Sequence, residues 1–440
     1  MASKSVPLPC ALPNTPLADA VPGINTCVHC GFCLQACPTY ITLQDENDSP
    51  RGRIFLMRSL VEGTLSVDDP TAHSHIDRCL GCRACETACP SGVPYGQLLE
   101  ATRATLTRVR PIPPVARTVL AVFARPRLLS IALGLGRLAR ATRLPRLLGR
   151  LLGGRLGFSM AMLAATEPAV ERGAPYDPDA LSSGAPGARG RAALLLGCVM
   201  EGLFAETNRA TERTLRANGY AMADAPGQRC CGALHAHAGD ADAARRLAKV
   251  NIAAFERSGA DLIAVNAAGC GAMMKEYAHL LAGEPEWHTR AAAVAERVRD
   301  VSELLAAAGP RPASAPLGTR VTYDAPCHLL HAQRVVAPPL KVLGAAGVEL
   351  VPLTDSDVCC GSAGIYNLVE PQVSSAVLAP KLAHIEATGA LLVATGNPGC
   401  LMQIGAGLRR AGSRARVVHP VELLDAAYGR EQQAGNKTPG

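Results

Sequence analysis

The hydrophobic positions in the second half of the chain form short unbroken runs separated by longer stretches with helical spacing. Short apolar runs are typical of strands buried on both faces of a parallel sheet. The longer stretches repeat an apolar residue every three or four positions, as amphipathic helices do. The pattern predicts α/β units with strands at 192–197, 262–266, 321–325 and 391–395 and helices at 241–258 and 373–388.

The first hundred residues show helical spacing instead. Residues 51–61 and 97–109 carry apolar side chains at this spacing, so we expect a helix in each. In the first helix we expect the arginines, including Arg51, Arg53 and Arg58, on the exposed side. Such a face is either solvated or a dock for an acidic partner.

Residues 101–166 hold twelve arginines and no Asp or Glu among Leu, Ala and Val. The formal net charge of +7 is therefore concentrated here, and the rest of the chain is net acidic. Arginines interrupt every apolar run before the roughly 18–20 residues that a membrane span requires, so no transmembrane helix is expected. Short helices broken at Pro126 and Pro145 are expected instead.

Two interpretations of this basic segment stay open. The helices can pack on the protein's own core, or they can lie against an anionic membrane surface. A helical pair inside the protein would be expected to carry compensating carboxylates. Their absence favours the membrane interpretation.

Two cysteine runs, 27–38 and 79–90, share the spacing Cys-x-x-Cys-x-x-Cys-x-x-x-Cys-Pro. This is the bacterial ferredoxin run, whose fourth cysteine ligates the neighbouring [4Fe-4S] cluster. Structural zinc sites are the alternative, but zinc does not need the third Cys-x-x step or the matching prolines. The predicted ligand sets are Cys27, Cys30, Cys33 and Cys89 for one cluster, and Cys79, Cys82, Cys85 and Cys37 for the other.

A second repeat is fixed by cysteines after residue 190. A lone cysteine, a Cys-Cys-Gly step and a last cysteine recur at nearly equal intervals, and they follow predicted strand ends. Because parallel strands end at one edge of a sheet, four thiols should converge in each repeat. The two sets are Cys198, Cys230, Cys231 and Cys270, and Cys327, Cys359, Cys360 and Cys400.

Nearby histidines invite a ligand interpretation, but four thiols per repeat leave little need for one. They are His235, His237, His328 and His331.

Composition limits the function. The 440 residues suffice for two or three domains, and 17 cysteines without a secretory signal indicate a reducing cytosol. No dinucleotide fingerprint, P-loop or catalytic triad is found, so no catalytic residue is predicted and no nucleic acid is expected as a partner.

With these motifs, and with the stretches Arg51-Gly52-Arg53-Ile54 and Leu194 to Cys198, the chain resembles the iron-sulfur subunits of glycolate, lactate and glycerol-3-phosphate dehydrogenases, most closely that of glycolate oxidase. It also resembles the cysteine-rich component of the heterodisulfide reductases. That pattern ends each repeat in Cys-x-x-Cys, whereas Met273 and Gln403 stand here at the last position.

The resemblance implies redox clusters in the repeats, one or two, besides the two [4Fe-4S] clusters. It implies an electron-transfer subunit of a glycolate dehydrogenase, with FAD on partner subunits only, a quinone-type acceptor and peripheral binding at the cytoplasmic face of the inner membrane. A lactate or glycerol-3-phosphate enzyme, or a disulfide-reductase-like catalytic subunit, is the alternative.

The expected fold class is a multidomain α+β protein with a helical two-cluster ferredoxin domain, a basic helical connector and two α/β repeats related by a pseudo-two-fold. The expected boundaries are a loose tail at 1–20, the ferredoxin domain at 21–110, the connector at 111–173, a linker at 174–190, the repeats at 191–310 and 318–430, and a tail at 431–440.

Overall fold

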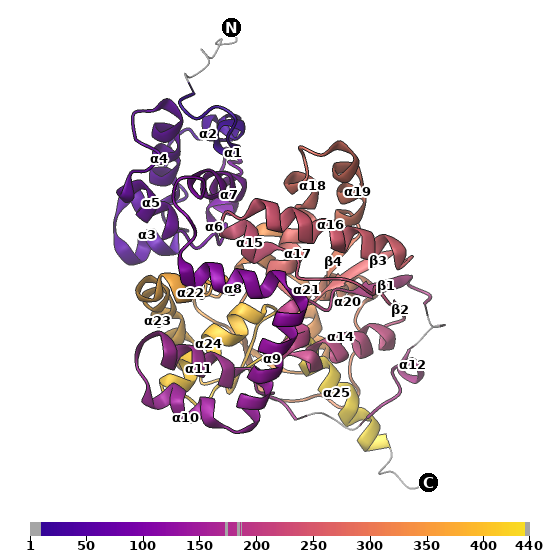
Figure 1. The fold of residues 1–440 in the computed structure, drawn as a ribbon. Helices are drawn as coiled ribbons and strands as arrows, with labels where there is room; N and C mark the ends of the chain where they lie inside the picture. The colour runs from indigo at the N-terminus through magenta and orange to yellow at the C-terminus, as the bar shows by residue number, and fades with distance from the viewer. Residues whose placement is uncertain (1–9, 172–174, 183–184, 186, 436–440) are drawn as a thin grey trace.

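The computed structural model describes residues 10–171, 175–182, 185 and 187–435. Its N-terminal part is helical and stands beside the two sheets (Figure 1). The elements of this part are α1 Pro16–Asp19, α2 Val21–Asn25, α3 Pro38–Leu43, η1 Glu46–Asp48, α4 Pro50–Glu62, α5 Pro70–Asp77, α6 Ala84–Ala88 and α7 Tyr95–Leu106.

The predicted helix after residue 50 is α4. Its first turn is capped by Ser49, whose Oγ accepts a hydrogen bond from Gly52 N, and Pro50 occupies a position where no N–H is needed. Gly63 ends the helix in the left-handed conformation. Met57 and Leu60 on its inner face are buried against Leu98 of α7 in the core of this domain.

Part of the expected N-terminal tail is folded. Thr15 caps α1, and Leu17 is fully buried in the core of the ferredoxin domain. Leu17 N also donates to Thr105 Oγ1 of α7 at 3.0 Å. A loose tail therefore does not describe residues 10–20, and residues 1–9 lie outside the described part. At the other end α25, Pro420–Gly435, runs into the expected C-terminal tail, of which 436–440 are likewise not described.

Two four-stranded parallel sheets form the second half of the chain, in the orders β2-β1-β3-β4 and β6-β5-β7-β8. The predicted strands appear as β1 Arg191–Leu194, β3 Leu262–Val265, β5 Arg320–Tyr323 and β7 Leu392–Ala394. The flanking strands were not predicted; they are β2 Ala221–Ala223, β4 Val298–Asp300, β6 Glu349–Val351 and β8 Arg416–Val418. The same strand order in both sheets is the structural counterpart of the sequence repeat.

Helices cover both sheets. The first repeat contains α13 Cys198–Leu203, α14 Ala205–Ala217, α15 Ala233–His237, α16 Ala241–Arg257, α17 Ala268–Lys275, α18 Tyr277–Leu280, α19 Pro285–Ala295 and α20 Val301–Ala308. The second contains η2 His328–Ala332, α21 Pro338–Ala345, α22 Tyr366–Val369, α23 Pro371–Thr388, α24 Pro398–Arg410 and α25. The predicted helices at 241–258 and 373–388 are thus confirmed as α16 and α23.

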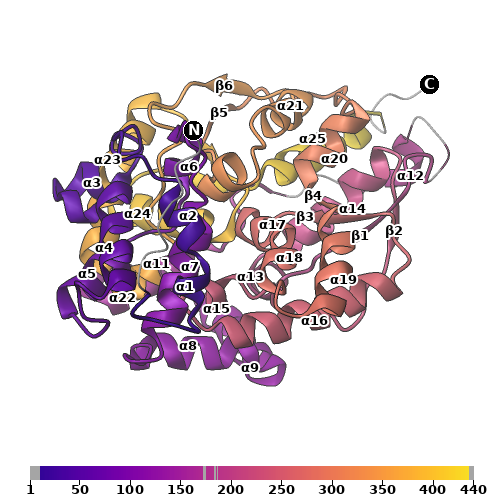
Figure 2. The same cartoon turned by 90° about the horizontal axis from the view of Figure 1, so that it is seen from above.

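The two repeats share one core. Leu194 of β1, Val321 of β5 and Leu424 of α25 belong to the same buried apolar cluster. Arg213 of α14 also pairs with Asp425 of α25, with Nη2 and Oδ2 2.7 Å apart. The repeats are therefore packed into one body, which Figure 2 shows from above.

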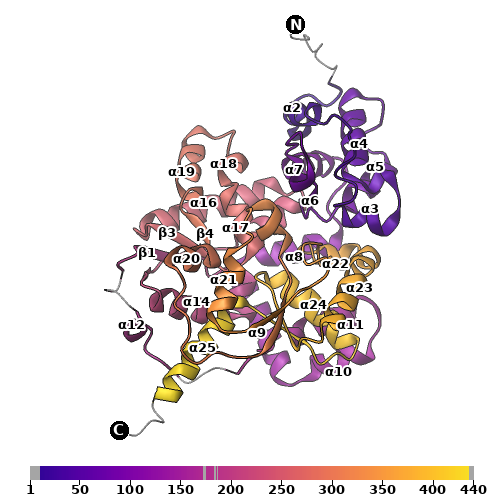
Figure 3. The ribbon, with the colours of Figure 1, turned by 180° about the vertical axis from the view of Figure 1, so that it is seen from behind.

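The basic connector forms α8 Pro114–Ala124, α9 Pro126–Ala141, α10 Leu144–Leu151 and α11 Gly154–Ala165, preceding the short helix α12 Pro178–Leu181. The breaks fall at Pro126 and near Pro145, as predicted. Small residues let α11 approach the second repeat: a Cβ on Gly405 of α24 would lie 2.7 Å from Ala165 Cβ. One side of the connector is thus packed on the protein's own core, beside α24 (Figure 3).

Candidate metal centres

The first ferredoxin set lies near the surface. Cys27, Cys30, Cys33 and Cys89 line one small cavity together with Cys85. Cys30 is exposed, and Phe32 beside it is 68% exposed. Cys89 of the second run therefore lies beside three thiols of the first run, as the crossed pairing requires, but Cys85 lies there as well, so the pairing stays a prediction.

The second ferredoxin set is buried. Cys37, Cys79, Cys82 and Cys85 line a neighbouring cavity, and each side chain is less than one-tenth exposed. Burial raises the pKa of the Cys82 and Cys85 thiols well above its ordinary value. A thiolate at such a site needs a compensating positive charge, which metal ions supply.

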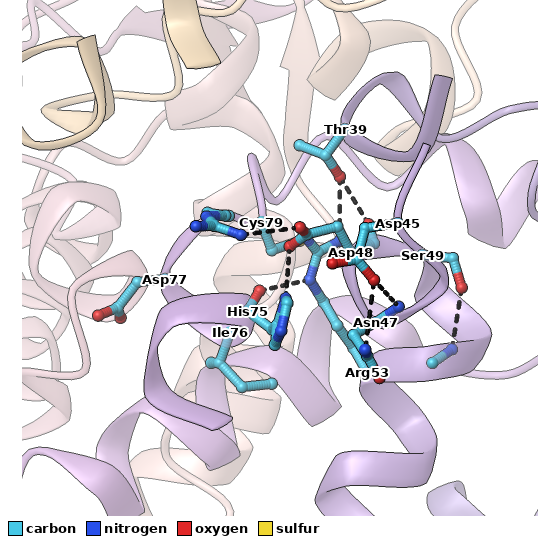
Figure 4. Close-up of polar contacts among 12 residues, drawn as sticks. Thr39, Asp45, Asn47, Asp48, Ser49, Arg53, His75, Ile76, Asp77 and Cys79 are labelled. Atoms are coloured by element: carbon cyan, nitrogen blue, oxygen red, sulfur yellow. Dashed lines mark hydrogen bonds and ion pairs between the residues drawn. The ribbon is translucent and has the colours of Figure 1, made fainter. Parts of the chain in front are cut away.

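A buried ion-pair network supports this second set, and it corrects the expectation for α4. Arg53 is fully buried rather than on the exposed side of the helix. Its guanidinium donates to Asp48 Oδ1 at 3.1 Å, to Thr39 Oγ1 at 3.1 Å and to the carbonyl of His75 at 2.6 Å (Figure 4). Thr39 Oγ1 in turn lies 3.2 Å from Cys37 Sγ. The arginine therefore connects the loop before α4 to a cysteine of the buried set.

Tyr95 supports the same set from the other side. Its hydroxyl donates to Cys79 Sγ at 3.6 Å and is buried. Neither Arg53 nor Tyr95 was singled out from the sequence as part of the site. A lone arginine or tyrosine at helical spacing carries no signal of its own, since burial depends on the partner elements.

The lone and the last cysteine of each repeat follow the carboxyl ends of the inner strands, as predicted, and the Cys-Cys pairs line the same cavity. Sγ of Cys198 lies 3.6 Å from Sγ of Cys230 in the first repeat. In the second, the Cys327–Cys359 and Cys360–Cys400 sulfurs are 3.9 and 3.3 Å apart. Thiolates on one tetrahedral metal ion with bonds of about 2.3 Å are separated by roughly 3.8 Å. The donor type and spacing therefore fit metal or cluster ligation.

All eight repeat cysteines line a single cavity of about 490 Å³. Gly232 and Gly361, which follow the Cys-Cys pairs, have φ of 93° and 81°. A Cβ on Gly361 would also lie 2.7 Å from the carbonyl oxygen of Ser374. Glycine is thus required for the turn that aims both adjacent thiols into the cavity.

The residues in place of a fifth thiol are structural. Met273 is buried in the core of the first repeat. Gln403 is fully buried, accepts a hydrogen bond from Asn367 Nδ2 at 3.0 Å and donates one to Ser374 Oγ at 2.9 Å. Its amide is therefore used within the protein.

The four histidines have different surroundings. His331 Nδ1 lies 3.0 Å from Thr87 Oγ1 of the ferredoxin domain, and His237 Nδ1 lies 2.9 Å from Glu100 Oε1. His235 is almost fully buried, and burial lowers its pKa. Nε2 of His328 is buried without a hydrogen-bond partner among the described residues. His237 and His328 line the large cavity, with ring centroids 5.5 Å apart.

The ferredoxin domain contacts the second repeat at the buried cysteine set. Cys82 packs in one apolar cluster with Cys327 and Cys359. Tyr366 of α22 donates through its hydroxyl to the carbonyl of Arg78 at 2.8 Å. The two kinds of cysteine site are therefore neighbours.

The outer side of the connector is apolar and basic. No single helix among the described residues is long and apolar enough to cross a membrane, although the bent pair α8 and α9 passes the same test of length and composition when taken together. The exposed large apolar residues of the connector are Val115, Leu128, Ile131, Leu135, Leu138, Leu144, Leu147, Leu151 and Leu156.

Some connector arginines have partners in the protein. Arg146 pairs with Glu167, with Nη2 and Oε2 2.6 Å apart, and Arg140 Nη1 donates to the carbonyl of Leu203 at 3.0 Å. By contrast, none of the following pairs with a carboxylate within the described part of the chain: Arg117, Arg125, Arg127, Arg137, Arg143 and Arg150.

Comparison with protein families matches the two regions separately. A family model described as a 4Fe-4S dicluster domain matches residues 23–93. A model described as a cysteine-rich domain, CCG, matches residues 192–275 and 321–405. The matched ranges contain all sixteen cysteines of the predicted sites.

Two similar proteins match nearly the whole chain, and a third matches about half of it. A probable glycolate oxidase iron-sulfur subunit of Bacillus subtilis (strain 168) is 39% identical over 420 residues, covering 92% of this chain and 94% of its own. The glycolate oxidase iron-sulfur subunit of Escherichia coli (strain K12) is 32% identical, covering 94% and 96%. Lactate utilization protein A of Geobacillus kaustophilus (strain HTA426) is 30% identical and covers 54% of this chain.

Proposed function

The chain belongs to the family of glycolate oxidase iron-sulfur subunits, and from this premise we propose that it carries electrons from a flavin-containing partner subunit to a quinone-type acceptor at a membrane surface. Iron-sulfur clusters, when bound, supply one-electron steps between such partners. The overall reaction proposed for the complex is oxidation of glycolate to glyoxylate on the partner.

The proposed ligands are the sixteen cysteines in four sets. The ferredoxin sets are Cys27, Cys30, Cys33 with Cys89, and Cys79, Cys82, Cys85 with Cys37, each for one [4Fe-4S] cluster. The repeat sets are Cys198, Cys230, Cys231 with Cys270, and Cys327, Cys359, Cys360 with Cys400. The grouping of each ferredoxin set around its own cavity supports the assignment.

The observation that carries the proposal is the graded exposure of the cysteine sets. The set of Cys30 is open to the surface beside Phe32, whereas that of Cys82 is buried and packs against Cys327 of the second repeat. A partner can approach the first set but not the second. We therefore assign electron entry to the exposed set and onward transfer to the contact between Cys82 and Cys327.

Attachment to the membrane is assigned to the outer side of the connector. Its leucines and several arginines are exposed, and these arginines pair with no carboxylate among the described residues, whereas its α11 side packs on α24. Near an anionic leaflet each arginine contributes on the order of 1 kcal/mol, and this contribution falls with salt. This arrangement suits peripheral binding.

The alternative of a disulfide-reductase-like catalytic subunit receives less support. That pattern needs a further thiol in each repeat, and here Met273 and Gln403 are committed to packing and internal hydrogen bonds. An equivalent subunit of a lactate or glycerol-3-phosphate enzyme would use the same cysteine sites. Only the substrate that the partner oxidises distinguishes such a subunit from that of a glycolate enzyme.

The test is anaerobic co-purification of the chain with candidate flavin-containing dehydrogenase subunits from the same organism. The expected complex contains iron and acid-labile sulfide in the chain, flavin only in the partner, and glycolate-dependent reduction of a short-chain quinone. If the complex oxidises lactate or glycerol 3-phosphate but not glycolate, the substrate assignment is wrong and the other substrate takes its place. Reduction of a disulfide by the chain alone, with a chemical reductant, would instead identify a disulfide-reductase-like catalytic subunit.

A further inference from the structure

The large cavity extends beyond the repeat cysteines. One wall is built by α8, from which Ala116, Val119 and Phe123 line the space. These positions share one face of the helix, because they are spaced by three and four residues. The loop and helix after the second Cys-Cys-Gly step, residues 362–369, also line the cavity. This part of the cavity is apolar and lies between the cysteine sites and the connector.

The other face of α8 points away from the protein. Val115 is 52% exposed, and Arg117 is exposed as well. In the next helix, α9, no residue is buried, and Ile131, Leu135 and Leu138 are exposed. The surface proposed to meet the membrane is thus continuous with the wall of the cavity through a single helix.

Polar groups without partners lie at the cysteine end of this space. Ser362 is 3% exposed and lines the cavity, and its Oγ has no hydrogen-bond partner among the described residues. His328 also lines the cavity, and its Nε2 likewise has no hydrogen-bond partner among the described residues. Buried polar atoms left without partners are costly unless a ligand or water pairs with them.

A third polar group can exchange protons with solvent. His237 lines the cavity, is about one-third exposed, and is held through Nδ1 by Glu100 at 2.9 Å. This contact fixes the ring, so Nε2 is the nitrogen left to face a ligand. Arg103 Nη1 donates to the carbonyl of His237 at 2.9 Å and holds the backbone of the same residue.

We propose that a quinone binds in this part of the cavity, with its ring between Ser362, His328 and His237 and its isoprenoid tail along Ala116, Val119 and Phe123. The inference rests on the proposed function and adds the place of the acceptor. Reduction of the quinone takes two electrons and two protons; clusters held by the repeat cysteines would supply the electrons singly, drawn from the partner flavin. The two carbonyl groups become hydroxyl groups, and the protons enter through His237, which is reprotonated from solvent.

Photoaffinity labelling of the cluster-loaded complex tests the site without relying on turnover. The probe is a short-chain quinone carrying an azido group, and the labelled peptides are identified by mass spectrometry. Label is expected on the peptide containing α8 or on residues 362–369, and unlabelled quinone should compete for it. Label confined to the ferredoxin domain or to α19 overturns the proposal.

Variants of one helix supply the matched control. Val119→Trp fills the cavity and should lower labelling at least about tenfold, whereas Val115→Trp, on the outer face of α8, should retain it. Iron content is measured in both. If Val119→Trp does not retain iron, the test uses Phe123→Ala instead, and labelling of this variant should decrease at least about threefold. Equal labelling of the wild-type and cavity variants rejects the site.

The acceptor site and the proposed function fail in different ways. A complex that reduces an artificial dye with glycolate but takes no label on α8 or 362–369 retains the proposed function and loses the acceptor site. A complex that takes label there but oxidises no 2-hydroxy acid loses the glycolate assignment alone. The proton path has its own readout: His237→Gln should lower kcat for quinone more than kcat for a dye that accepts electrons without protons.

Discussion

Cys82 of the ferredoxin domain and Cys327 of the second repeat are packed in the same buried apolar cluster, although 245 positions separate them in the sequence. Leu80 and Tyr366 complete the contact. Each of the two cysteines belongs to a set of four. The contact therefore gives the two kinds of site a shared apolar boundary.

This contact predicts the effect of removing Cys327. In Cys327→Ala, the ferredoxin sites should still accept electrons from the partner, because Cys82 and its set are unchanged. Transfer onward to quinone should slow by at least about tenfold. Rapid-freeze EPR after glycolate addition checks this, and Cys198→Ala in the first repeat is the comparison. Equal slowing of ferredoxin reduction itself would show that the route does not pass this boundary.

The crossed ferredoxin ligation predicts which signal Cys37→Ala removes. Cys37 lines the cavity of Cys79, Cys82 and Cys85, so the cluster of the second run should be lost or converted. EPR of the reduced variant should retain the signal of the exposed set. Loss confined to the set of Cys27, Cys30 and Cys33 would contradict the assignment.

The cysteine spacing was sufficient to predict the two kinds of site and the strand ends that hold the repeat cysteines. It could do so because ligand geometry and parallel-strand topology depend on local sequence. The edge strands were missed, since β2 and β6 are three residues each and carry no long apolar run. The burial of Arg53 was missed because its partner Asp48 precedes the helix, whereas helical spacing only describes the helix itself.

The histidine roles were also beyond the sequence. His237 meets Glu100 across a domain boundary, and Ser362 lines a cavity to which residues of α8 also contribute. Such pairs depend on how the ferredoxin domain and connector dock on the repeats. One side of the connector packs on the core, which was one of the two interpretations of its composition, while its outer leucines are exposed and membrane contact stays a proposal.

The Arg53 network predicts a large loss of stability on truncation. Arg53→Gln leaves Asp48 buried with fewer charge partners, so we expect a cost of about 3–5 kcal/mol in the free energy of unfolding. Arg290→Gln, which breaks the surface pair with Glu256, should cost less than about 1 kcal/mol. Thermal unfolding of the apo proteins, followed by circular dichroism, compares them. Similar melting temperatures for the two variants would argue against a structural role for the buried pair.

His419 predicts a stability loss in mild acid. Its Nε2 lies 3.0 Å from the carbonyl oxygen of Asn266, and its Nδ1 accepts from Val421 N, so the ring is neutral. Burial lowers the pKa of His419 from 6.5 to about 4. The unfolded chain therefore takes up the proton first, and stability is lost as the pH falls from 6.5 towards 4, by on the order of 3 kcal/mol.

The measurement is the urea midpoint of the apo protein between pH 7 and 4.5. In His419→Gln the midpoint should start lower but fall less steeply with acid, because the titrating group is gone. His288→Gln, at an exposed site, should follow the wild-type profile. A His419→Gln profile parallel to wild type would assign the acid sensitivity to other groups.

The connector predicts membrane binding that depends on particular arginines rather than on net charge alone. Arg127, Arg137, Arg143 and Arg150 are exposed and pair with no carboxylate within the described residues, so they are available to anionic lipid. Replacing these four with glutamine should abolish flotation of the complex with anionic vesicles at low salt. Near a charged leaflet the combined loss is on the order of 4 kcal/mol.

Two other arginines of the connector serve as a control, because they make the same substitution possible at sites that already have partners in the protein. Arg140 and Arg146 already bond to Leu203 O and Glu167, so their replacement by glutamine should disturb packing more than lipid binding. Leu135→Glu together with Leu138→Glu tests the apolar contribution, since it places charge where burial in the interface is expected. If the complex binds neutral and anionic vesicles equally, or if the four-arginine variant still floats while losing its flavoprotein partner, the basic face is a protein interface and the acceptor must reach the cavity by another path.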